Sequence, residues 1–261
     1  IILRRSRLFP VHRAGLALSV CCLLPKTSVG DLIRVPDDFP TIGIAIFEAA
    51  PLDTIIVAPG TYYEAINFSG KIIRIQSENP NDPNVVANTI NDASGLGTVV
   101  SFSGTKEGEN AWLYGFTVTG GTTGSNGHGS SAEVENCVVR DNSASGISNL
   151  HGPISGCEIR NNGGNGLSNC DGVISFSVVR DNARIGLSDC DGTITGCEIV
   201  GNAKVRTSSG DTSAGLWRCD AIIKDSLIAG NDYANLKECD ARISNCLIYN
   251  ARRSLGLEYG N

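Results

Sequence analysis

Apolar residues return along the chain at an interval of about 20 residues. One column of β-branched aliphatic side chains opens each row: Val134, Ile154, Ile174, Ile194, Ile223 and Ile243. A column of small residues stands three positions later: Cys137, Cys157, Ser177, Cys197, Ser226 and Cys246. A second apolar column follows two positions further on: Val139, Ile159, Val179, Ile199, Ile228 and Ile248. The interval lengthens to 29 residues only between Ile194 and Ile223.

Rows of this length predict a solenoid. A row is shorter than the roughly 30 residues of a βαβ unit, so its short strands pair with the equivalent strands of the next row. Parallel strands lie about 4.8 Å apart, and the connections between them are right-handed. We therefore predict an all-β fold, a single-stranded right-handed parallel β-helix with coils of about 20 residues.

The residue before the small column supports this prediction. Its members are Gly115, Asn136, Gly156, Phe176, Gly196, Asp225 and Asn245. All of them except Phe176 tolerate the left-handed backbone conformation well. A tight bend at this place lets the apolar residues on both sides of it point inward.

The region upstream of the repeat predicts a different element. Residues 39–51 (FPTIGIAIFEAAP) place Ile42, Ile46, Ala49 and Ala50 at helical spacing. We expect a short helix that covers the N-terminal end of the solenoid, which would otherwise be an open sheet edge. Residues 53–62 and 70–78 read as the first buried strands, and residues 79–84 (NPNDPN) as a turn-rich loop.

The first 30 residues have the pattern of a secretory leader. Four arginines precede the apolar run AGLALSVCCLL, and small residues follow near position 30. The run is shorter than the roughly 20 residues that span a bilayer, so no stable membrane insertion is expected after the leader is removed. We predict a protein that is secreted, periplasmic or displayed at the cell surface. Residues 31–261 form the β-helix domain, which we expect to be truncated at its C-terminus.

Net charge and cysteine content limit the kinds of partner, metal site and disulfide that the sequence allows. A net charge of -6 argues against nucleic acid. Eight of the ten cysteines lie beyond the leader, and they stand in lines, one per coil. Parallel side chains in such a line do not converge as a tetrahedral zinc site or a disulfide requires. We therefore expect buried free thiols, no metal site and a monomeric protein.

The segment TIGIAIFEAAPLDTIIVAPGTYYEAINFSGKIIRIQSENP is similar to the opening of secreted pectin-lyase-like right-handed β-helix proteins. The later segments SENPNDPNVVANTI, WLYGFTVTGG and ENCVVRDN resemble bacterial right-handed β-helix repeat proteins, which are mostly secreted or envelope-associated. The resemblance covers residues 31–261 and implies the fold. It leaves the activity open, because the superfamily includes lyases, hydrolases, esterases, epimerases and non-catalytic binders.

Catalytic motifs of the resembled families are absent or incomplete. Pectin methylesterases carry paired glutamines and an aromatic-flanked arginine, and the sequence has no such motif. Polygalacturonases carry an Asp pair, a GHG motif and an RIK motif. This chain has Gly127-His128-Gly129 and Lys204-Val205-Arg206, without an Asp pair one coil before His128. We interpret the GHG segment as the strand-opening position that Gly146-Ile147 occupies one coil later.

Two outward columns of charged residues are candidate ligand sites. The basic column contains Arg140, Arg160 and Arg180. It predicts either a stripe for an anionic polysaccharide or a solvated ladder balanced by Asp141, Glu158 and Asp181, and the second interpretation is favoured. The acidic column contains Asp171, Asp191, Asp220 and Asp240, with His151 one coil earlier. Calcium between coils would relieve its repulsion, whereas Asp before Gly or Ala is typical of turns, which is the favoured interpretation.

The longest departure from the repeat is the segment 203–214 (AKVRTSSGDTSA). Loops that interrupt a regular scaffold often carry function, so Arg206 and the neighbouring Trp217 are candidate ligand contacts. We expect a non-catalytic carbohydrate-binding or scaffold module, with no cofactor unless calcium binds. The alternative is a polyuronate lyase or glycoside hydrolase that uses Asp171 or Asp191 with Arg180.

Overall fold

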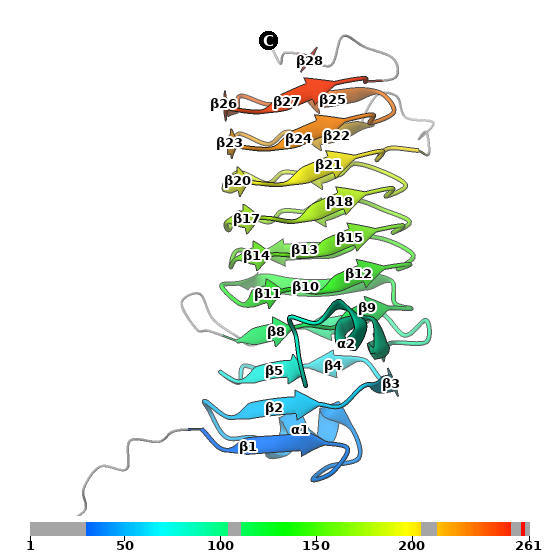
Figure 1. Ribbon diagram of the computed structural model, residues 1–261, viewed down its shortest axis with the longest axis vertical. Coiled ribbons are helices and arrows are strands. Elements are labelled where there is room, and N and C mark those ends of the chain that lie inside the picture. The colour runs from blue at the N-terminus through cyan, green and yellow to red at the C-terminus, as the bar shows by residue number, and fades with distance from the viewer. Residues whose placement is uncertain (1–29, 104–110, 205–212, 252–256, 259–261) are drawn as a thin grey trace, which may run out of the picture.

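The chain winds into a column of stacked coils with a short helix at its N-terminal end (Figure 1). The computed structural model describes residues 30–103, 111–204, 213–251 and 257–258. Its strands form three parallel sheets, one of 10 and two of 9 strands. The structure is the predicted right-handed parallel β-helix.

Sheet A contains one strand of each coil. Its strands, in order, are β1 (Leu32–Val35), β2 (Thr54–Val57), β5 (Arg74–Ser77), β8 (Trp112–Tyr114), β11 (Glu133–Glu135), β14 (Ile154–Ser155), β17 (Ile174–Ser175), β20 (Thr193–Thr195), β23 (Ile222–Lys224) and β26 (Arg242–Ser244). The first apolar column lies in this sheet, with Val134, Ile154, Ile174, Ile194, Ile223 and Ile243 in register as predicted.

Sheet B follows sheet A in each coil after a tight bend. Its strands are β3 (Gly60–Tyr63), β6 (Thr89–Asp92), β9 (Thr117–Thr119), β12 (Val138–Arg140), β15 (Glu158–Arg160), β18 (Val178–Arg180), β21 (Glu198–Val200), β24 (Leu227–Ala229) and β27 (Leu247–Tyr249). The second apolar column lies here, also in register.

Sheet C closes each coil. Its strands are β4 (Ile66–Asn67), β7 (Thr98–Ser101), β10 (Thr123–Ser130), β13 (Ile147–Leu150), β16 (Leu167–Ser168), β19 (Leu187–Ser188), β22 (Ala214–Trp217), β25 (Ala234–Lys237) and β28 (Leu257–Glu258). The core lies between the three sheets, where Ile154, Ile159 and Leu167 have no exposed surface.

The bend between sheets A and B has the predicted left-handed backbone in every coil from Gly115 to Asn245. Phe176 takes this conformation as well, with φ of 49°. The sequence offers no signal for it, because a bulky residue is a rare occupant of this region. The stacking of equivalent coils on both sides imposes the bend on Phe176. We call this line of residues the bend row.

The cysteines beyond the leader are free thiols, as expected. Six are buried, and Cys239 and Cys246 are half-buried. Cys219 and Cys239 lie on successive coils, and the backbone N–H of Cys219 donates to Cys239 Sγ at 3.4 Å. These small side chains fill the interior where the chain turns, which is a common role for free cysteine.

A ladder of buried asparagines runs beside the apolar core. Its members are Asn142, Asn162, Asn182, Asn202 and Asn231. The Nδ2 group of each of the first four donates to Oδ1 of the next, at distances of 3.0, 3.0, 3.0 and 3.2 Å. The backbone N–H of each of these four residues donates to the same Oδ1 atom of the next asparagine. The sequence places these residues in a column, and the structure shows that the column ties successive coils together.

Helix α1 (Ile42–Glu48) covers the N-terminal end of the column, as predicted. Thr41 caps its start, and Ile42, Ala45 and Ile46 are buried. Two residues from the first coil hold its ends. Glu64 accepts from the N–H groups of Ile42 and Gly43, each at 2.8 Å. At the other end Lys71 Nζ donates to three carbonyl oxygens, those of Ile46 at 2.7 Å, Phe47 at 2.5 Å and Ala49 at 2.7 Å.

The Lys71→Met variant is expected to lose about 1–3 kcal/mol of unfolding free energy, because three helix carbonyls lose a charged donor at the end where the helix dipole is negative. Chemical denaturation measures the loss. Lys224→Met, at an exposed lysine on β23, should change stability by less than about 0.5 kcal/mol. Equal stability of the two variants would contradict the role given to Lys71.

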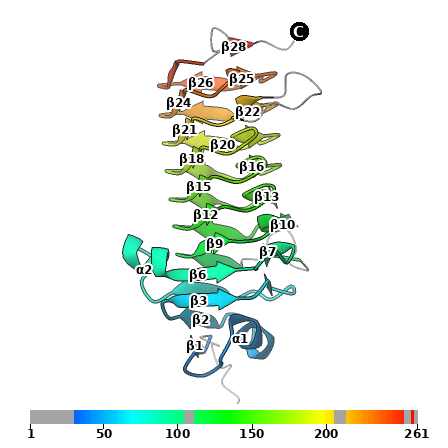
Figure 2. The same cartoon turned by 90° about the vertical axis from the view of Figure 1, so that its right-hand side faces the viewer.

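Helix α2 (Pro83–Asn88) corrects the prediction of a loop over residues 79–84. The loop ends at Asp82, which caps the helix through its side chain, and Pro83 supplies a backbone angle suited to the first turn. Thr117 Oγ1 donates to the carbonyl oxygen of Val86 at 3.0 Å, which fixes the helix against β9. Figure 2 shows α2 standing out from the column beside β6.

Candidate functional site

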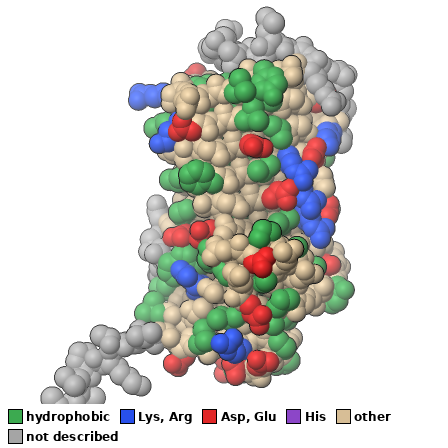
Figure 3. Space-filling model, in the orientation of Figure 1, with side chains coloured by type: hydrophobic (Ala, Val, Ile, Leu, Met, Phe, Trp, Pro, Cys, Tyr) green, Lys and Arg blue, Asp and Glu red, His purple; other side chains and the backbone are tan. Residues whose placement is uncertain are grey.

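The arginine column lies on sheet B, with Arg140, Arg160 and Arg180 in register. The three carboxylates expected to balance it are its partners. Glu158 lies 3.3 Å from Arg160 and 2.6 Å from Arg180, Asp141 pairs with Arg140, and Asp181 pairs with Arg180 at 2.7 Å. Figure 3 shows charges of both signs side by side along this edge of the column. The ladder is therefore balanced and presents no uniform positive stripe.

Asp181 joins this network to Lys204, whose Nζ lies 2.6 Å from Asp181 Oδ1. Desolvation opposes ionisation of the carboxyl group, but hydrogen bonds from Lys204 and Arg180 outweigh it and hold the pKa of Asp181 below its ordinary value. The carboxylate is thus ionised at neutral pH and committed to the two cations.

The aspartate column lies on the turn after sheet C, and its side chains are exposed. Oδ1 of Asp171, Asp191 and Asp220 accepts the backbone N–H of the next aspartate, at 3.1, 2.9 and 3.0 Å. The hydrogen bonds of these carboxylates join neighbouring coils, whereas the turn interpretation expected local ones. His151 Nε2 lies 3.7 Å from Asp171 Oδ2. Among the described residues no three His, Cys, Asp or Glu side chains are grouped to hold a metal ion.

The arginine and aspartate columns are not brought together. Arg180 ends a strand of sheet B, whereas Asp171 and Asp191 follow strands of sheet C. Arg180 bonds to Glu158 and Asp181 instead. The alternative catalytic set of Arg180 with Asp171 or Asp191 is therefore not assembled. Arg206 lies outside the described residues, and so does most of the leader.

Trp217 belongs to a line of side chains on sheet C, which we call the sheet C row; all of them except the buried Ser188 are at least partly exposed. Strand pairing aligns its members in this order: Asn67, Ser101, Asn126, Ser148, Ser168, Ser188, Trp217 and Lys237. Ser148, Ser168 and Ser188 follow a repeated Gly-Ile or Gly-Leu pair. That repeat marks the strand openings in the sequence, but the surface formed by the residue after it is visible only in the structure.

Trp217 is held by charged neighbours near the C-terminal end of the sheet C row. Its indole N–H donates to Glu238 Oε2 at 3.1 Å. The guanidinium of Arg218 lies 4.9 Å from the ring centroid and also pairs with Asp189 at 3.2 Å. These contacts fix the ring while leaving it half-exposed.

His128 also lies on sheet C, and its position corrects the interpretation of the GHG segment. Ser125 pairs with Ile147, so Gly124 and Ser125 occupy the strand-opening position. The register shifts between Asn126 and Ser130, which places His128 at the end of the strand with φ of 52°. Its Nε2 lies 3.0 Å from Ser101 Oγ. The sequence did not predict this pair, because the irregular register brings it about.

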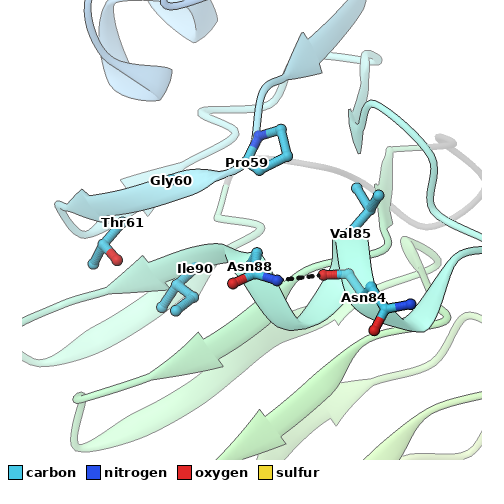
Figure 4. A pocket seen from close by; sticks show the side chains of 7 residues that line it. All are labelled: Pro59, Gly60, Thr61, Asn84, Val85, Asn88 and Ile90. Atoms are coloured by element: carbon cyan, nitrogen blue, oxygen red, sulfur yellow. Dashed lines mark hydrogen bonds between the residues drawn. The ribbon is translucent and has the colours of Figure 1, made fainter.

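Two pockets open on either side of α2. The first has a volume of about 520 Å³ and lies between α2 and the start of sheet B (Figure 4). Its lining is Pro59, Gly60, Thr61, Asn84, Val85, Asn88 and Ile90, which includes no ionisable side chain. The second, of about 280 Å³, lies between α2 and the later coils. Its lining is Pro80, Asn81, Pro83, Val86, Asn136, Cys137, Val138, Gly156 and Glu158.

The architecture is a right-handed parallel β-helix, and comparison with solved structures supports this fold. No family model and no curated protein sequence matches the chain. The alginate lyase of Paenibacillus sp. str. FPU-7 superposes with a TM-score of 0.58 at 16% identity, over 76% of this chain and 76% of the lyase.

Two further solved structures share the fold. The pectate lyase Pel9A gives a TM-score of 0.56 at 14% identity, over 82% of this chain and 67% of the lyase. The pectin methylesterase from Aspergillus niger gives 0.55 at 13% identity, over 84% and 86%. These neighbours are polysaccharide-active enzymes, and at such identities the likeness concerns the fold. Within the described part of the chain, no helix is long and apolar enough to cross a membrane.

Proposed function

We propose that this protein is a carbohydrate-binding β-helix that holds a polysaccharide along the sheet C row. The observation that carries the proposal is the row itself, a line of small hydroxyl and amide side chains, all but Ser188 at least partly exposed, followed by the half-exposed Trp217 and by Lys237. Coils repeat about every 4.8 Å, so the row presents a regular series of hydrogen-bonding groups to an extended chain of sugars. The aromatic ring of Trp217 provides an apolar surface for a sugar ring.

We propose that the protein binds the polysaccharide without cleaving or modifying it. Asp171, Asp191 and Asp220 each accept a backbone N–H of the next coil through one oxygen, and Arg180 bonds to Glu158 and Asp181. We further propose a secreted, periplasmic or cell-surface monomer, on the basis of the leader pattern and the net charge of -6. The shared fold of polysaccharide lyases and an esterase is consistent with a glycan ligand.

The Trp217→Ala variant is expected to bind polysaccharide at least about tenfold more weakly, a loss of roughly 1.4 kcal/mol. Affinity electrophoresis and calorimetry with polygalacturonate, alginate and neutral glucans measure the change. Trp112→Ala is the matched control, because Trp112 also carries an arginine over its ring, Arg74 at 5.4 Å, but lies on sheet A. Equal weakening by both variants, or none by Trp217→Ala, would refute the site.

An enzyme is the second candidate function, and the pair of Ser101 and His128 on the same sheet is the observation that favours it. The binding samples can be assayed for unsaturated products and for new reducing ends, with and without calcium. Turnover that is abolished in Asp191→Asn or His128→Ala would establish catalysis and replace the proposal of a non-catalytic binder.

A further inference from the structure

An unbroken column of four thiols follows the strands of sheet C. Its members, on four successive coils, are Cys170, Cys190, Cys219 and Cys239. The other column of small residues differs, because Ser177 and Ser226, both buried, interrupt its cysteines. Packing therefore accepts a small residue of either kind in this interior. An uninterrupted line of thiols is a reason to ask what sulfur atoms in a row can bind.

The four sulfur atoms occupy equivalent places in their coils. Each thiol donates to the carbonyl oxygen two residues before it, that of Ser168 at 3.5 Å, Ser188 at 3.3 Å, Trp217 at 3.5 Å and Lys237 at 3.2 Å. Since the side chains are parallel, their sulfur atoms repeat at the coil spacing of about 4.8 Å. The thiols are free, which agrees with a spacing far above the roughly 2.05 Å of a disulfide bond.

The spacing matches a linear unit of thiolate, metal and thiolate. A metal–thiolate bond is about 2.3 Å long, as for zinc, so two bonds in line span about 4.6 Å. Cu(I) is a soft ion that thiolates select, and it accepts two such ligands in a line. Zn²⁺ needs two further ligands, and in the described part of the chain no three His, Cys, Asp or Glu side chains are grouped to hold it. The parallel arrangement that excludes a tetrahedral ion suits a linear one.

Cys219 and Cys239 are the pair of this column that an ion can reach. Cys239 is half-buried, whereas the other three members have no exposed surface. The backbone N–H of Cys219 donates to Cys239 Sγ at 3.4 Å. A donor of this kind favours the charged form of the group that accepts it, which is the form that binds a metal.

We infer that Cys219 and Cys239 bind one Cu(I) ion between successive coils. Binding releases both thiol protons to solvent, so the complex carries a single negative charge, which is shared by two polarisable sulfur atoms. The carbonyl oxygens of Trp217 and Lys237 lose these S–H donors. Each keeps a backbone donor, the N–H of Asp189 at 3.0 Å and that of Arg218 at 3.1 Å. The site goes beyond the proposed function, because it requires no glycan.

Competition with the chelator bathocuproine disulfonate, in the absence of oxygen, tests the inference. The folded wild-type protein should retain one equivalent of Cu(I). Cys239→Ser should lose at least about 100-fold in affinity, because the loss of an outer-shell partner alone costs about 10–100-fold. The variant should fold, since serine already stands at buried small positions of other coils, at Ser177 and Ser226.

Cys246→Ser is the matched control, and it should bind Cu(I) as tightly as wild type. Cys246 is also half-buried, and its thiol donates to the carbonyl oxygen of Ser244 at 3.2 Å. Its equivalent one coil earlier is Ser226, so it has no thiol partner there.

Two measurements on the wild-type protein need no variant. Cu(I) should slow the alkylation of Cys239 by iodoacetamide and leave that of Cys246 unchanged, as peptide mapping by mass spectrometry can follow. X-ray absorption of the complex should show two sulfur neighbours of copper.

Four results would overturn the inference. They are a wild-type protein that yields all its Cu(I) to the chelator, a Cys239→Ser variant with wild-type affinity, equal losses in Cys239→Ser and Cys246→Ser, and a copper centre with three or more ligands. None of these measurements involves a glycan, so they are independent of the test at Trp217.

Discussion

Replacing Asn182 with aspartate is expected to lower the free energy of unfolding by about 3–5 kcal/mol at pH 7. Asn182 has no exposed surface, and its Nδ2 group donates to the carbonyl oxygen of Ile159 at 3.1 Å and to Asn202 Oδ1 at 3.0 Å. A carboxylate would place a negative charge against these two acceptors, with no room for water. The two hydrogen bonds that this Nδ2 group donates, one to the preceding coil and one to the next, would both be lost.

The loss should become smaller in acid. The protonated carboxyl group can donate one of the two hydrogen bonds, so the folded state raises the pKa of the introduced group above its unfolded value of about 3.9. Stability is therefore highest below that unfolded pKa, and it falls as the pH rises toward the folded pKa, by at most about 1.4 kcal/mol per pH unit. Urea unfolding of the variant and wild type at pH 4 and pH 7 measures this difference.

Asn169→Asp is the matched control for charge. Asn169 is exposed and left-handed with φ of 55°, and the equivalent residue one coil later is Asp189. It should change stability by less than about 0.5 kcal/mol at either pH. An Asn182→Asp variant that is as stable as wild type at pH 7, or relatively less stable at pH 4, would show that the asparagine ladder does not hold the coils together.

The Gly166→Ala variant is expected to lose about 2–3 kcal/mol, because the added methyl group overpacks a closed interior. A Cβ at this position would lie 2.5 Å from Val179 Cγ1, 2.7 Å from the carbonyl oxygen of Gly186 and 2.9 Å from Asn182 Nδ2. The replacement of glycine by alanine also restricts the unfolded chain, which raises the free energy of unfolding by less than about 1 kcal/mol. The methyl group must therefore push the asparagine ladder or the next coil outward.

Gly60→Ala provides the comparison for this prediction. The nearest atom to an added Cβ there is 3.6 Å away on the ring of Tyr62, an ordinary contact. Thermal and urea unfolding of both variants should separate them by at least about 2 kcal/mol. If Gly166→Ala unfolds at the same denaturant concentration as Gly60→Ala, the glycine beside the ladder is not required for coil stacking.

The sequence predicts the inside of this protein better than its surface. The columns that begin at Val134 and Val139 determine which residues face inward, and the structure keeps both in register over every coil. This succeeds because each inward position meets the same neighbours in the next coil. The helix at residues 42–48 was predictable for a similar reason, since its apolar spacing is local.

Surface features depend on contacts between coils, which the sequence of a single coil does not show. The column of asparagines is visible in the sequence, but its role depends on amide geometry across coils. Helix α2 falls where two prolines suggest a loop, and its position on sheet B follows from the contact between Thr117 and Val86. The left-handed backbone at Phe176 has no local signal, because neighbouring coils impose it.

The candidate site shows the same division. Trp217 and the exposed aspartates were found in the sequence, and the balance of the arginine column by Glu158 followed from its place in the row. The distribution of these residues over two sheets could not be predicted from the sequence, because it depends on where each coil turns. The pair of Ser101 and His128 depends on an irregular register that no repeat predicts.

The interval of 29 residues between Ile194 and Ile223 leaves the pairing of their strands intact. Loop closure entropy grows slowly with length, so a turn of this column can lengthen without disturbing the coils that it joins. Evolution can therefore add or exchange a segment at one turn while the other coils serve as an unchanged frame. For protein engineering, the same turn is a place to insert a peptide or a small domain with no redesign of the interior.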